Sequence, residues 1–317
     1  MKVGFHSHGL TLRGSEVALL DYALLNESIL GNRSYLVVPE RPGLESHPVF
    51  QSWRSKLPCL VYRNREDLAA KLRQEGVEVL YQIKPGRNDG FVVPGVRNCI
   101  HAMFAHTEFH GDVYVYVSRW LSRVMTGRED RFVPHLVRTS AHRGNWRAKL
   151  GIPPQARVFG RHGAADTFNL SFAQEVVRQH AREHPEDHFC FLHTANFLPR
   201  GAQLPNVHFF PGTHDLEEKG AFLHTCDAML HAREHGETFG LAVGEFAVSG
   251  KPVITFARSR ECAHLESLGS EALTYRNKKE LESILKNFKR GEAGKTAYHD
   301  YADPRTVMEI FRRIFLF

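Results

Sequence analysis

Short apolar segments, each bounded by glycine, proline or polar residues, recur along the first half of the chain. Segments of this length and composition are typical of buried strands. Between the first two, Val17, Leu20, Leu24 and Leu25 follow the spacing of a helix. Because strands alternate with helices, the pattern predicts a parallel sheet covered on both faces. The expected strands are Lys2–Phe5, Ser34–Val38, Val77–Gln82, Val96–His101 and Val113–Ser118.

A second series of the same kind begins after residues 139–154, a polar and basic stretch that ends in two prolines. We interpret this stretch as the connection between two domains. The alternation that follows it predicts a second α/β domain of the nucleotide-binding type. Its expected strands are 157–160, 189–194, 207–210, 228–231 and 252–256, and its expected helices are 172–184, 216–225 and 240–249.

The last segment, residues 303–317, is amphipathic and rich in apolar residues, which predicts a helix that docks on a domain. We therefore expect an N-terminal Rossmann-like domain over residues 1–142 and a C-terminal Rossmann-like domain over residues 143–302. The helix 303–317 is expected to pack on the N-terminal domain. The predicted fold class is α/β, with two domains and a cleft between them, and such sheets bind ligands at the carboxyl ends of their strands.

Length and composition agree with this organisation. A chain of 317 residues is too long for one comfortable core and suits two. No apolar run reaches the roughly 18 to 20 residues that span a bilayer. The first residues do not resemble a signal peptide, and the five cysteines are widely spaced, as in proteins of reducing compartments. We expect a cytoplasmic protein without an integral membrane segment.

The formal charge of +6 and the pI near 9.1 indicate an anionic partner. The lysines and arginines are dispersed, and the sequence holds neither a long basic run nor a recognisable nucleic-acid-binding module. A phosphorylated small molecule therefore explains the charge more simply than a nucleic acid does.

The segment Met229–Phe256 is the most informative part of the chain. Two glutamates, Glu237 and Glu245, are separated by seven residues and lie around the start of a predicted helix. The amides of Thr238–Leu241 lie where that helix begins, so they can donate hydrogen bonds to an anion with the help of the helix dipole. Glu245 lies two turns further on, where its carboxylate can accept from hydroxyls such as a ribose diol. Glu237 can reach a sugar or order the loop.

This segment resembles the E-x7-E signature of retaining glycosyltransferases with the GT-B fold, in the glycosyltransferase family 4 group. The family pattern is roughly E-x-F-G-(apolar)-x-x-x-E-(A/F)-x-x-x-G-x-P-V-I. The resemblance implies two Rossmann-like domains, a nucleotide-sugar donor, no bound metal, and transfer with retention of the anomeric configuration. The matching positions are Glu237, Phe239, Gly240, Leu241, Glu245, Phe246, Gly250, Pro252, Val253 and Ile254.

Three further segments resemble the same family. Val158–Arg161 is similar to the strand and Gly-Arg pair whose arginine approaches the donor diphosphate, although the lysine that usually follows is replaced within Ala164–Thr167. Asn206–Gly212 resembles the strand and loop that read the nucleotide base. Arg13–Glu16 resembles the glycine-rich loop that faces the donor phosphate and the acceptor. The resemblance leaves the second phosphate-binding cation without a candidate.

The resemblance assigns roles to particular residues. His101 ends a predicted strand where family members often carry a histidine near the transferred sugar, and a purely structural histidine explains it equally well. The expected catalytic residues are Arg161, Glu237 and His101, and the expected donor-binding residues are Gly14, Gly160, Arg161, Gly212, Thr238, Phe239, Gly240, Leu241 and Glu245.

Other histidines are candidates with a simpler explanation beside them. His6 and His8 follow the first strand and can line the cleft or be solvated loop residues. His180, His184 and His188 have a spacing that suggests a metal site, but Pro185 interrupts the helix between them. We expect no metal and no other cofactor.

The expected function is transfer of a sugar from a UDP- or GDP-sugar to a hydroxyl acceptor, with a glycan as the expected acceptor. Three alternatives stay open. The same fold also serves nucleotide-sugar epimerases, and the missing lysine is compatible with a non-catalytic nucleotide-sugar-binding module. The net positive charge leaves a nucleic-acid binder as the third.

Overall fold

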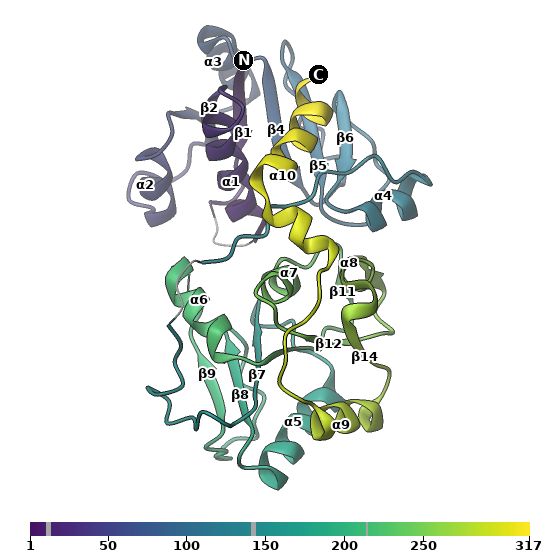
Figure 1. The fold of residues 1–317 in the computed structure, drawn as a ribbon. Coiled ribbons are helices and arrows are strands. Elements are labelled where there is room, and N and C mark those ends of the chain that lie inside the picture. The colour runs from purple at the N-terminus through teal and green to yellow at the C-terminus, as the bar shows by residue number, and fades with distance from the viewer. Residues whose placement is uncertain (11–13, 141–143, 214) are drawn as a thin grey trace. The chain divides into compact units, whose positions relative to one another are not determined.

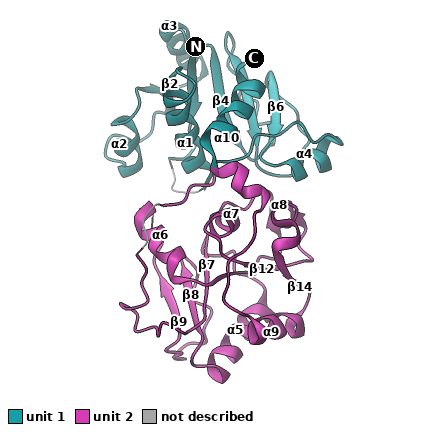
Figure 2. Ribbon diagram, in the orientation of Figure 1, with its two compact units in different colours: residues 1–136, 303–317 teal, residues 137–302 magenta. Residues whose placement is uncertain are grey.

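Two six-stranded parallel sheets carry the fold, one in each half of the chain (Figure 1). In the computed structural model, which describes residues 1–10, 14–140, 144–213 and 215–317, the chain divides into two units. Unit 1 consists of Met1–Leu136 and Asp303–Phe317, and unit 2 of Val137–Ala302 (Figure 2). Each unit is an α/β fold of the Rossmann type, which confirms the predicted fold class.

The sheet of unit 1 has the strand order β3-β2-β1-β4-β5-β6, and its neighbouring strands run parallel. Its strands are β1 (Lys2–His6), β2 (Arg33–Pro39), β3 (Cys59–Tyr62), β4 (Val79–Lys84), β5 (Arg97–Ala102) and β6 (Val113–Tyr116). Its helices are α1 (Gly14–Ser28), α2 (Pro48–Arg54), α3 (Arg65–Glu75), α4 (Arg119–Thr126) and α10 (Pro304–Phe311), and a single π turn (Arg312–Leu316) follows α10.

The terminal helix α10 packs on the sheet of unit 1 beside α1 (Figure 1). The ring of Phe311 stacks on Tyr22 of α1 at 5.1 Å and on Phe5 of β1 at 6.2 Å between centroids. The apolar face that the sequence predicts for residues 303–317 is thus buried against aromatic side chains of the same unit.

The sheet of unit 2 has the strand order β14-β12-β10-β7-β8-β9, again parallel, and a two-stranded ladder, β11-β13, stands apart from it. The strands are β7 (Val158–His162), β8 (His188–Leu192), β9 (Val207–Phe210), β10 (Ala228–His231), β11 (Gly236–Glu237), β12 (Val253–Phe256), β13 (Glu261–Cys262) and β14 (Ala272–Tyr275). The helices are α5 (Ser171–Glu183), α6 (Leu216–Thr225), α7 (Leu241–Val248), α8 (Ala263–Leu268) and α9 (Lys278–Asn287), with 3-10 turns at Gly269–Glu271 and Ala297–Ala302.

Most expected strands agree with the observed ones to within a few residues, but the short ladder β11-β13 and two strands of the six-stranded sheets were not expected. The two unexpected strands of the six-stranded sheets are β3 and β14, which are the outer strands on one side of their sheets and are four residues long each. An edge strand buries less of its surface, so its sequence needs no continuous apolar run. In β14, Leu273 and Thr274 are accordingly exposed.

Among the described residues, no helix has the length and apolarity to cross a bilayer. All five cysteines carry free thiols.

Candidate functional site

The carboxyl edge of the unit 2 sheet contains the point where the strand order reverses. From β7 the chain proceeds to β8 and β9 on one side, and α6 then returns it to β10 on the other side of β7. In open α/β sheets, ligands bind at such a point, outside the carboxyl ends of the strands. Arg161 lies near the end of β7 and Glu237 follows β10, so the topology brings both residues to this edge.

Arg161 lies within β7, whereas we expected it in the loop after that strand, and its side chain is buried. The guanidinium donates to the hydroxyls of Thr194 and Thr167 and to the carbonyl of Ala164, 3.0 Å away. Burial lowers the pKa of Arg161 to about 10, although the nearby Glu237 acts in the opposite direction. The group is therefore charged at neutral pH. Within the described residues, these three bonds leave two of the five N–H donors of a guanidinium for a ligand.

Glu237 is held by two basic side chains. Arg233 donates to Oε2 over 2.7 Å, and His231 Nε2 lies 3.3 Å from Oε1. Burial opposes ionisation of this carboxyl, but His231 and Arg233 outweigh it and lower its pKa to about 2. Glu237 is therefore a fixed anion beside the cationic Arg161.

Helix α7 begins at Leu241, four residues after Glu237, within one residue of the start that the sequence predicts. Its N-cap is Gly240, which has a φ of +87°, and none of the described side chains caps the first turn. A glycine suits this conformation because it lacks the Cβ that disfavours positive φ. Thr238 and Phe239 are buried, and the carbonyl of Phe239 accepts a hydrogen bond from the Tyr298 hydroxyl. The first amides of α7, from Leu241 onward, are thus available for an anion at a helix N-terminus.

Glu245, on the second turn of α7, is buried and paired with two basic groups. Lys219 of α6 donates to Oε1, and His162 Nε2, at the end of β7, lies 2.9 Å from Oε2. Burial acts to raise the pKa of Glu245, but Lys219 and His162 outweigh it and hold the pKa below the ordinary value. The carboxylate keeps further lone pairs that can accept hydrogen bonds from a ligand.

At two of the expected donor-binding glycines, packing within the protein already explains why a glycine is present. A Cβ on Gly160 would lie 2.1 Å from the sulfur of Cys226, so β7 passes close to Cys226 only because residue 160 is glycine. A Cβ on Gly212, in the loop after β9, would lie within 3.0–3.2 Å of the His193 ring. Neither contact requires a ligand.

In unit 1, His101 is a core residue, and its side chain is 0% exposed. Its Nδ1 lies 2.6 Å from the Tyr81 hydroxyl and its Nε2 lies 2.9 Å from the carbonyl of Val133. Burial lowers the pKa of His101 well below its ordinary value. With both ring nitrogens engaged, His101 fits the structural interpretation, and the structure gives no support to a catalytic one.

The predicted glycine-rich loop of unit 1 is described only in part. Arg13 lies outside the described residues, and Gly14 is the first residue of α1. Glu16 accepts a hydrogen bond from the Ser7 hydroxyl at 2.5 Å. His6 and His8 contact each other at 3.2 Å at the carboxyl end of β1, and burial lowers the pKa of both.

The rings of His180 and His184 lie 4.5 Å apart between centroids, but His180 and His188 are bonded to other side chains. His180 bonds Asp187 at 2.7 Å, and His188 Nδ1 lies 3.1 Å from His208 Nε2. Over the described part of the chain, no group of three or more His, Cys, Asp or Glu side chains has the arrangement of a metal site.

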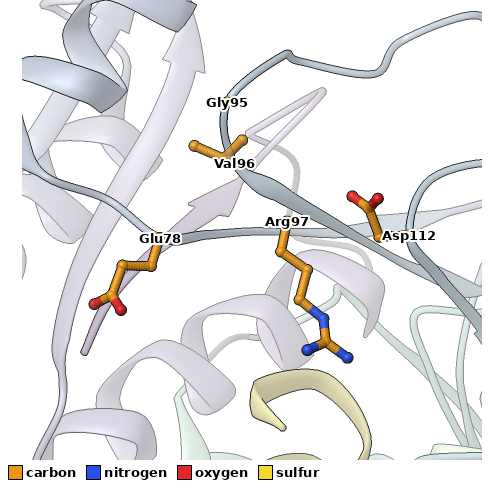
Figure 3. Close-up of a pocket in the computed structure, with 5 residues that line it drawn as sticks. All are labelled: Glu78, Gly95, Val96, Arg97 and Asp112. Carbon is orange, nitrogen blue, oxygen red and sulfur yellow. The ribbon is translucent and has the colours of Figure 1, made fainter.

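A cavity of about 660 Å³ lies in unit 1, and Figure 3 shows five of its lining residues. Glu78 directly precedes β4 and Arg97 begins β5, so this cavity is at the amino ends of these strands. Arg97 also donates to the carbonyl oxygen of Phe317 at 2.7 Å. Ligand sites of α/β sheets lie at the opposite edge, and we therefore do not assign the candidate site to this cavity.

Sequence patterns did not identify four of the side chains that build the site. Lys219, His162, His231 and Thr194 contact the expected residues only through the tertiary fold. Lys219 is 26 residues from Glu245 in the sequence. It follows Glu217 and Glu218 in the first turn of α6, and its sequence neighbours do not indicate that it contacts Glu245. Arg233, in contrast, was detectable because it precedes Glu237 by four residues.

No model of a known protein family and no curated protein matches the sequence. Solved structures do share the fold. The Anabaena protein HepE, described in complex with UDP-glucose, has a TM-score of 0.65 and 16% identity, over 99% of this chain and 95% of that chain. A glycosyltransferase from Rickettsia africae has a TM-score of 0.63 and 11% identity, over 99% and 94%. At these identities the comparisons establish the two-domain fold alone.

A protein described as a putative epimerase also has this fold. A putative UDP-N-acetylglucosamine 2-epimerase from Listeria monocytogenes has a TM-score of 0.56 and 12% identity, over 98% of this chain and 94% of that chain. Fold alone therefore does not distinguish transfer of a sugar from epimerisation.

Proposed function

We propose that the protein transfers a sugar from a UDP- or GDP-sugar to a hydroxyl group of a glycan acceptor, with retention of the anomeric configuration. The observation that carries the proposal is the pair of held carboxylates, Glu237 and Glu245, around the uncapped start of α7. A nucleoside diphosphate sugar matches these features group by group. Its diphosphate can bind at the start of α7, its ribose can donate hydrogen bonds to Glu245, and its sugar can donate to Glu237.

The donor diphosphate binds at the α7 amides from Leu241 onward, where the helix dipole favours negative charge. Arg161, on the neighbouring β7, adds a guanidinium that remains charged at neutral pH. Glu245 accepts hydrogen bonds from the ribose hydroxyls, and Lys219 and His162 hold it in place.

Catalysis follows from the charge that develops on the leaving diphosphate. As the bond between sugar and phosphate breaks, fixed donors at the diphosphate gain interaction energy, which lowers the barrier. Glu237 accepts a hydrogen bond from a hydroxyl of the transferred sugar and orients it. Retention follows if the acceptor hydroxyl attacks from the face that the diphosphate leaves, and no carboxylate of the chain is assigned as a covalent nucleophile.

The similar structures support the proposal, because HepE is described in complex with UDP-glucose and another neighbour is described as a glycosyltransferase. The free thiols of all five cysteines support a reducing compartment such as the cytoplasm. Unit 1 is assigned to the acceptor on the family resemblance alone.

A second candidate is epimerisation of a nucleotide sugar, which the Listeria neighbour favours. Both candidates need the same donor site, but only the transferase needs an acceptor.

The first experiment is a thermal-shift screen of UDP, GDP, ADP and their sugars, followed by proton NMR of each ligand that stabilises the protein. A selective ligand raises the apparent stability by mass action. We expect a UDP- or GDP-sugar to bind and its sugar to keep its configuration in the absence of an acceptor. Conversion to the C2 epimer supports the second candidate, and stabilisation by none of these ligands contradicts both.

A further inference from the structure

A chain of buried polar side chains leads from Glu237 into the interior of unit 2. It consists of His231 at the end of β10, Thr255 on β12 and His264 on α8, and these three side chains are 4%, 0% and 0% exposed. His231 and Thr255 are paired residues of neighbouring strands, so their side chains leave the sheet on the same face. None of the three was expected to have a function.

The contacts between these side chains are continuous. His231 Nε2 lies 3.3 Å from Glu237 Oε1, and His231 Nδ1 lies 2.8 Å from the Thr255 hydroxyl oxygen. The same oxygen lies 3.1 Å from His264 Nε2. The two imidazole rings are 4.9 Å apart between centroids.

The direction of these hydrogen bonds follows from Glu237. An ionised carboxylate only accepts, so His231 Nε2 must carry the proton and donate it. In a neutral imidazole the other nitrogen then accepts, and Thr255 must donate its hydroxyl proton to His231 Nδ1. The Thr255 oxygen is left to accept from His264 Nε2.

This order leaves His264 Nδ1 as a nitrogen without a proton. Within the described residues, this buried atom has no hydrogen-bond partner. Burial lowers the pKa of His264 to about 3, although a hydrogen bond with the backbone of Glu237 acts in the opposite direction. The ring is therefore neutral and carries one proton, as the order requires. With a neutral His231, this arrangement of protons satisfies each contact between Glu237, His231, Thr255 and His264.

We propose that His231, Thr255 and His264 form a relay that fixes the Nε2–H tautomer of His231 and thereby positions the Glu237 carboxylate. The relay residues do not touch the substrate, so they are positioning residues. Their catalytic consequence rests on the proposed function, in which Glu237 orients the transferred sugar, whereas the fixed tautomer does not depend on it.

Other charged groups also act on Glu237, and the test must separate them from the relay. Arg233 donates to the second carboxylate oxygen at 2.7 Å and is unaffected by changes in Thr255. Among the described residues, Arg161, Glu261, His264 and Tyr298 also interact with Glu237.

The test compares three substitutions in the full chain. Thr255→Val removes the hydroxyl from the relay, and Thr255→Ser retains it. Thr274→Val makes the same change at the paired residue of β14, which is exposed and outside the relay. Thermal unfolding of each variant checks that unit 2 is folded.

Nitrogen-15 NMR of labelled histidine reports the tautomers directly, and carbon-13 NMR of labelled glutamate reports the ionisation of Glu237. We expect the Nε2–H form for both His231 and His264 in the wild type. Thr255→Val should release His231 into a mixture of tautomers and raise the pKa of Glu237. Thr255→Ser and Thr274→Val should behave as the wild type does.

In donor turnover, Thr255→Val should lower kcat roughly 10- to 100-fold, since a misplacement of about 1 Å in a reacting group can cost about 100-fold. The affinity for UDP should stay unchanged, because Glu245 and α7 are intact. His231→Leu should move the acid limb of the pH profile to higher pH, because it removes a group that lowers the pKa of Glu237. His231→Gln should restore the limb, since its amide can replace the Nε2 donor.

An Nδ1–H tautomer of His231 in the wild type, or a Thr255→Val variant with an unchanged tautomer and kcat, overturns the proposal. If the wild type turns over no nucleotide sugar, the proposed function fails, and the NMR measurements still decide whether the relay exists.

Discussion

Arg161 and Lys219 are two of the cations that the fold brings near the carboxylates of the E-x7-E segment, besides Arg233 on Glu237. They differ in how they are held: Arg161 by neutral hydroxyls and a carbonyl, and Lys219 by Glu245 itself. A cation whose hydrogen-bond partners are neutral is not neutralised by an ion pair, so its charge can stabilise a bound anion. The charge of Lys219 is already paired with Glu245, so we assign Lys219 to orienting that carboxylate.

Arg161→Ala should lower kcat by about 100-fold or more, the scale of removing one electrostatic donor from a transition state. Its interaction with the diphosphate strengthens as the leaving group gains charge. Arg161→Lys should recover only part of the loss, because an ammonium does not reproduce bidentate contact with two phosphate oxygens. Steady-state kinetics with the donor measure this, and Arg182→Ala, an exposed site on α5, is the control. Normal turnover by Arg161→Ala means that the diphosphate binds elsewhere.

Glu245→Gln should weaken binding of the donor nucleotide by about 1 to 3 kcal/mol, the scale of hydrogen bonds to a charged group. The amide offers the ribose a weaker acceptor and also loses the ion pair with Lys219. Titration calorimetry with UDP or GDP measures the change, with Glu292→Gln at an exposed position of unit 2 as the control. An unchanged affinity in a folded variant removes the assignment of Glu245 to the ribose.

Helix α7 shows how much of the site a sequence pattern contains. The order of Glu237, Gly240 and Glu245 predicts a helix start between two carboxylates, and the structure has it there. The partners of those carboxylates come from other elements, α6 and β7 for Glu245 and β10 for Glu237. Only the fold sets such contacts, so local periodicity did not predict them.

His101 is the opposite case. Its place at the end of a strand was compatible with a sugar contact and with a core residue, and the sequence left both open. The structure shows a histidine whose two nitrogens are taken by Tyr81 and the Val133 carbonyl. Tyr81 belongs to the neighbouring strand, β4, and a pattern of apolar segments does not say which strands pair.

Gly240→Ala should destabilise unit 2 by about 1 to 3 kcal/mol, the cost of holding a residue in a rarely populated backbone conformation. The φ of +87° disfavours alanine, and its Cβ would lie 3.0 Å from the Tyr298 hydroxyl oxygen. Urea unfolding measures the change. Gly291→Ala is the matched control, because its Cβ would meet open space at an ordinary φ. Equal stability of both variants contradicts the assigned conformation of the α7 start.

At the scale of the whole molecule, two parallel sheets of the same size and strand pattern stand in one chain. In each sheet, the second and third strands in sequence lie on one side of the first strand, and the later strands lie on its other side. Each unit therefore has its own point where the strand order reverses. Alternation of strands and helices predicted this fold class, because that pattern admits few other arrangements. Solved structures with the same fold include one described as a glycosyltransferase and one described as a putative epimerase.

Activity should survive removal of divalent metals. In the proposed mechanism Arg161 and the α7 amides stabilise the diphosphate, which is the task that Mg²⁺ or Mn²⁺ performs elsewhere. Turnover after EDTA treatment, compared with turnover after MnCl₂ is added back, measures this. Complete loss on chelation that Mn²⁺ restores contradicts the mechanism.

The most direct measurement of the central claim follows the release of nucleoside diphosphate from a donor panel with and without glycan acceptors. Proton NMR of the product reports its anomeric configuration. The account predicts that release depends on an acceptor and that the new linkage keeps the configuration of the donor sugar. Glu237→Gln should abolish most of this release. Binding without acceptor-dependent release, or a product of inverted configuration, would contradict the account.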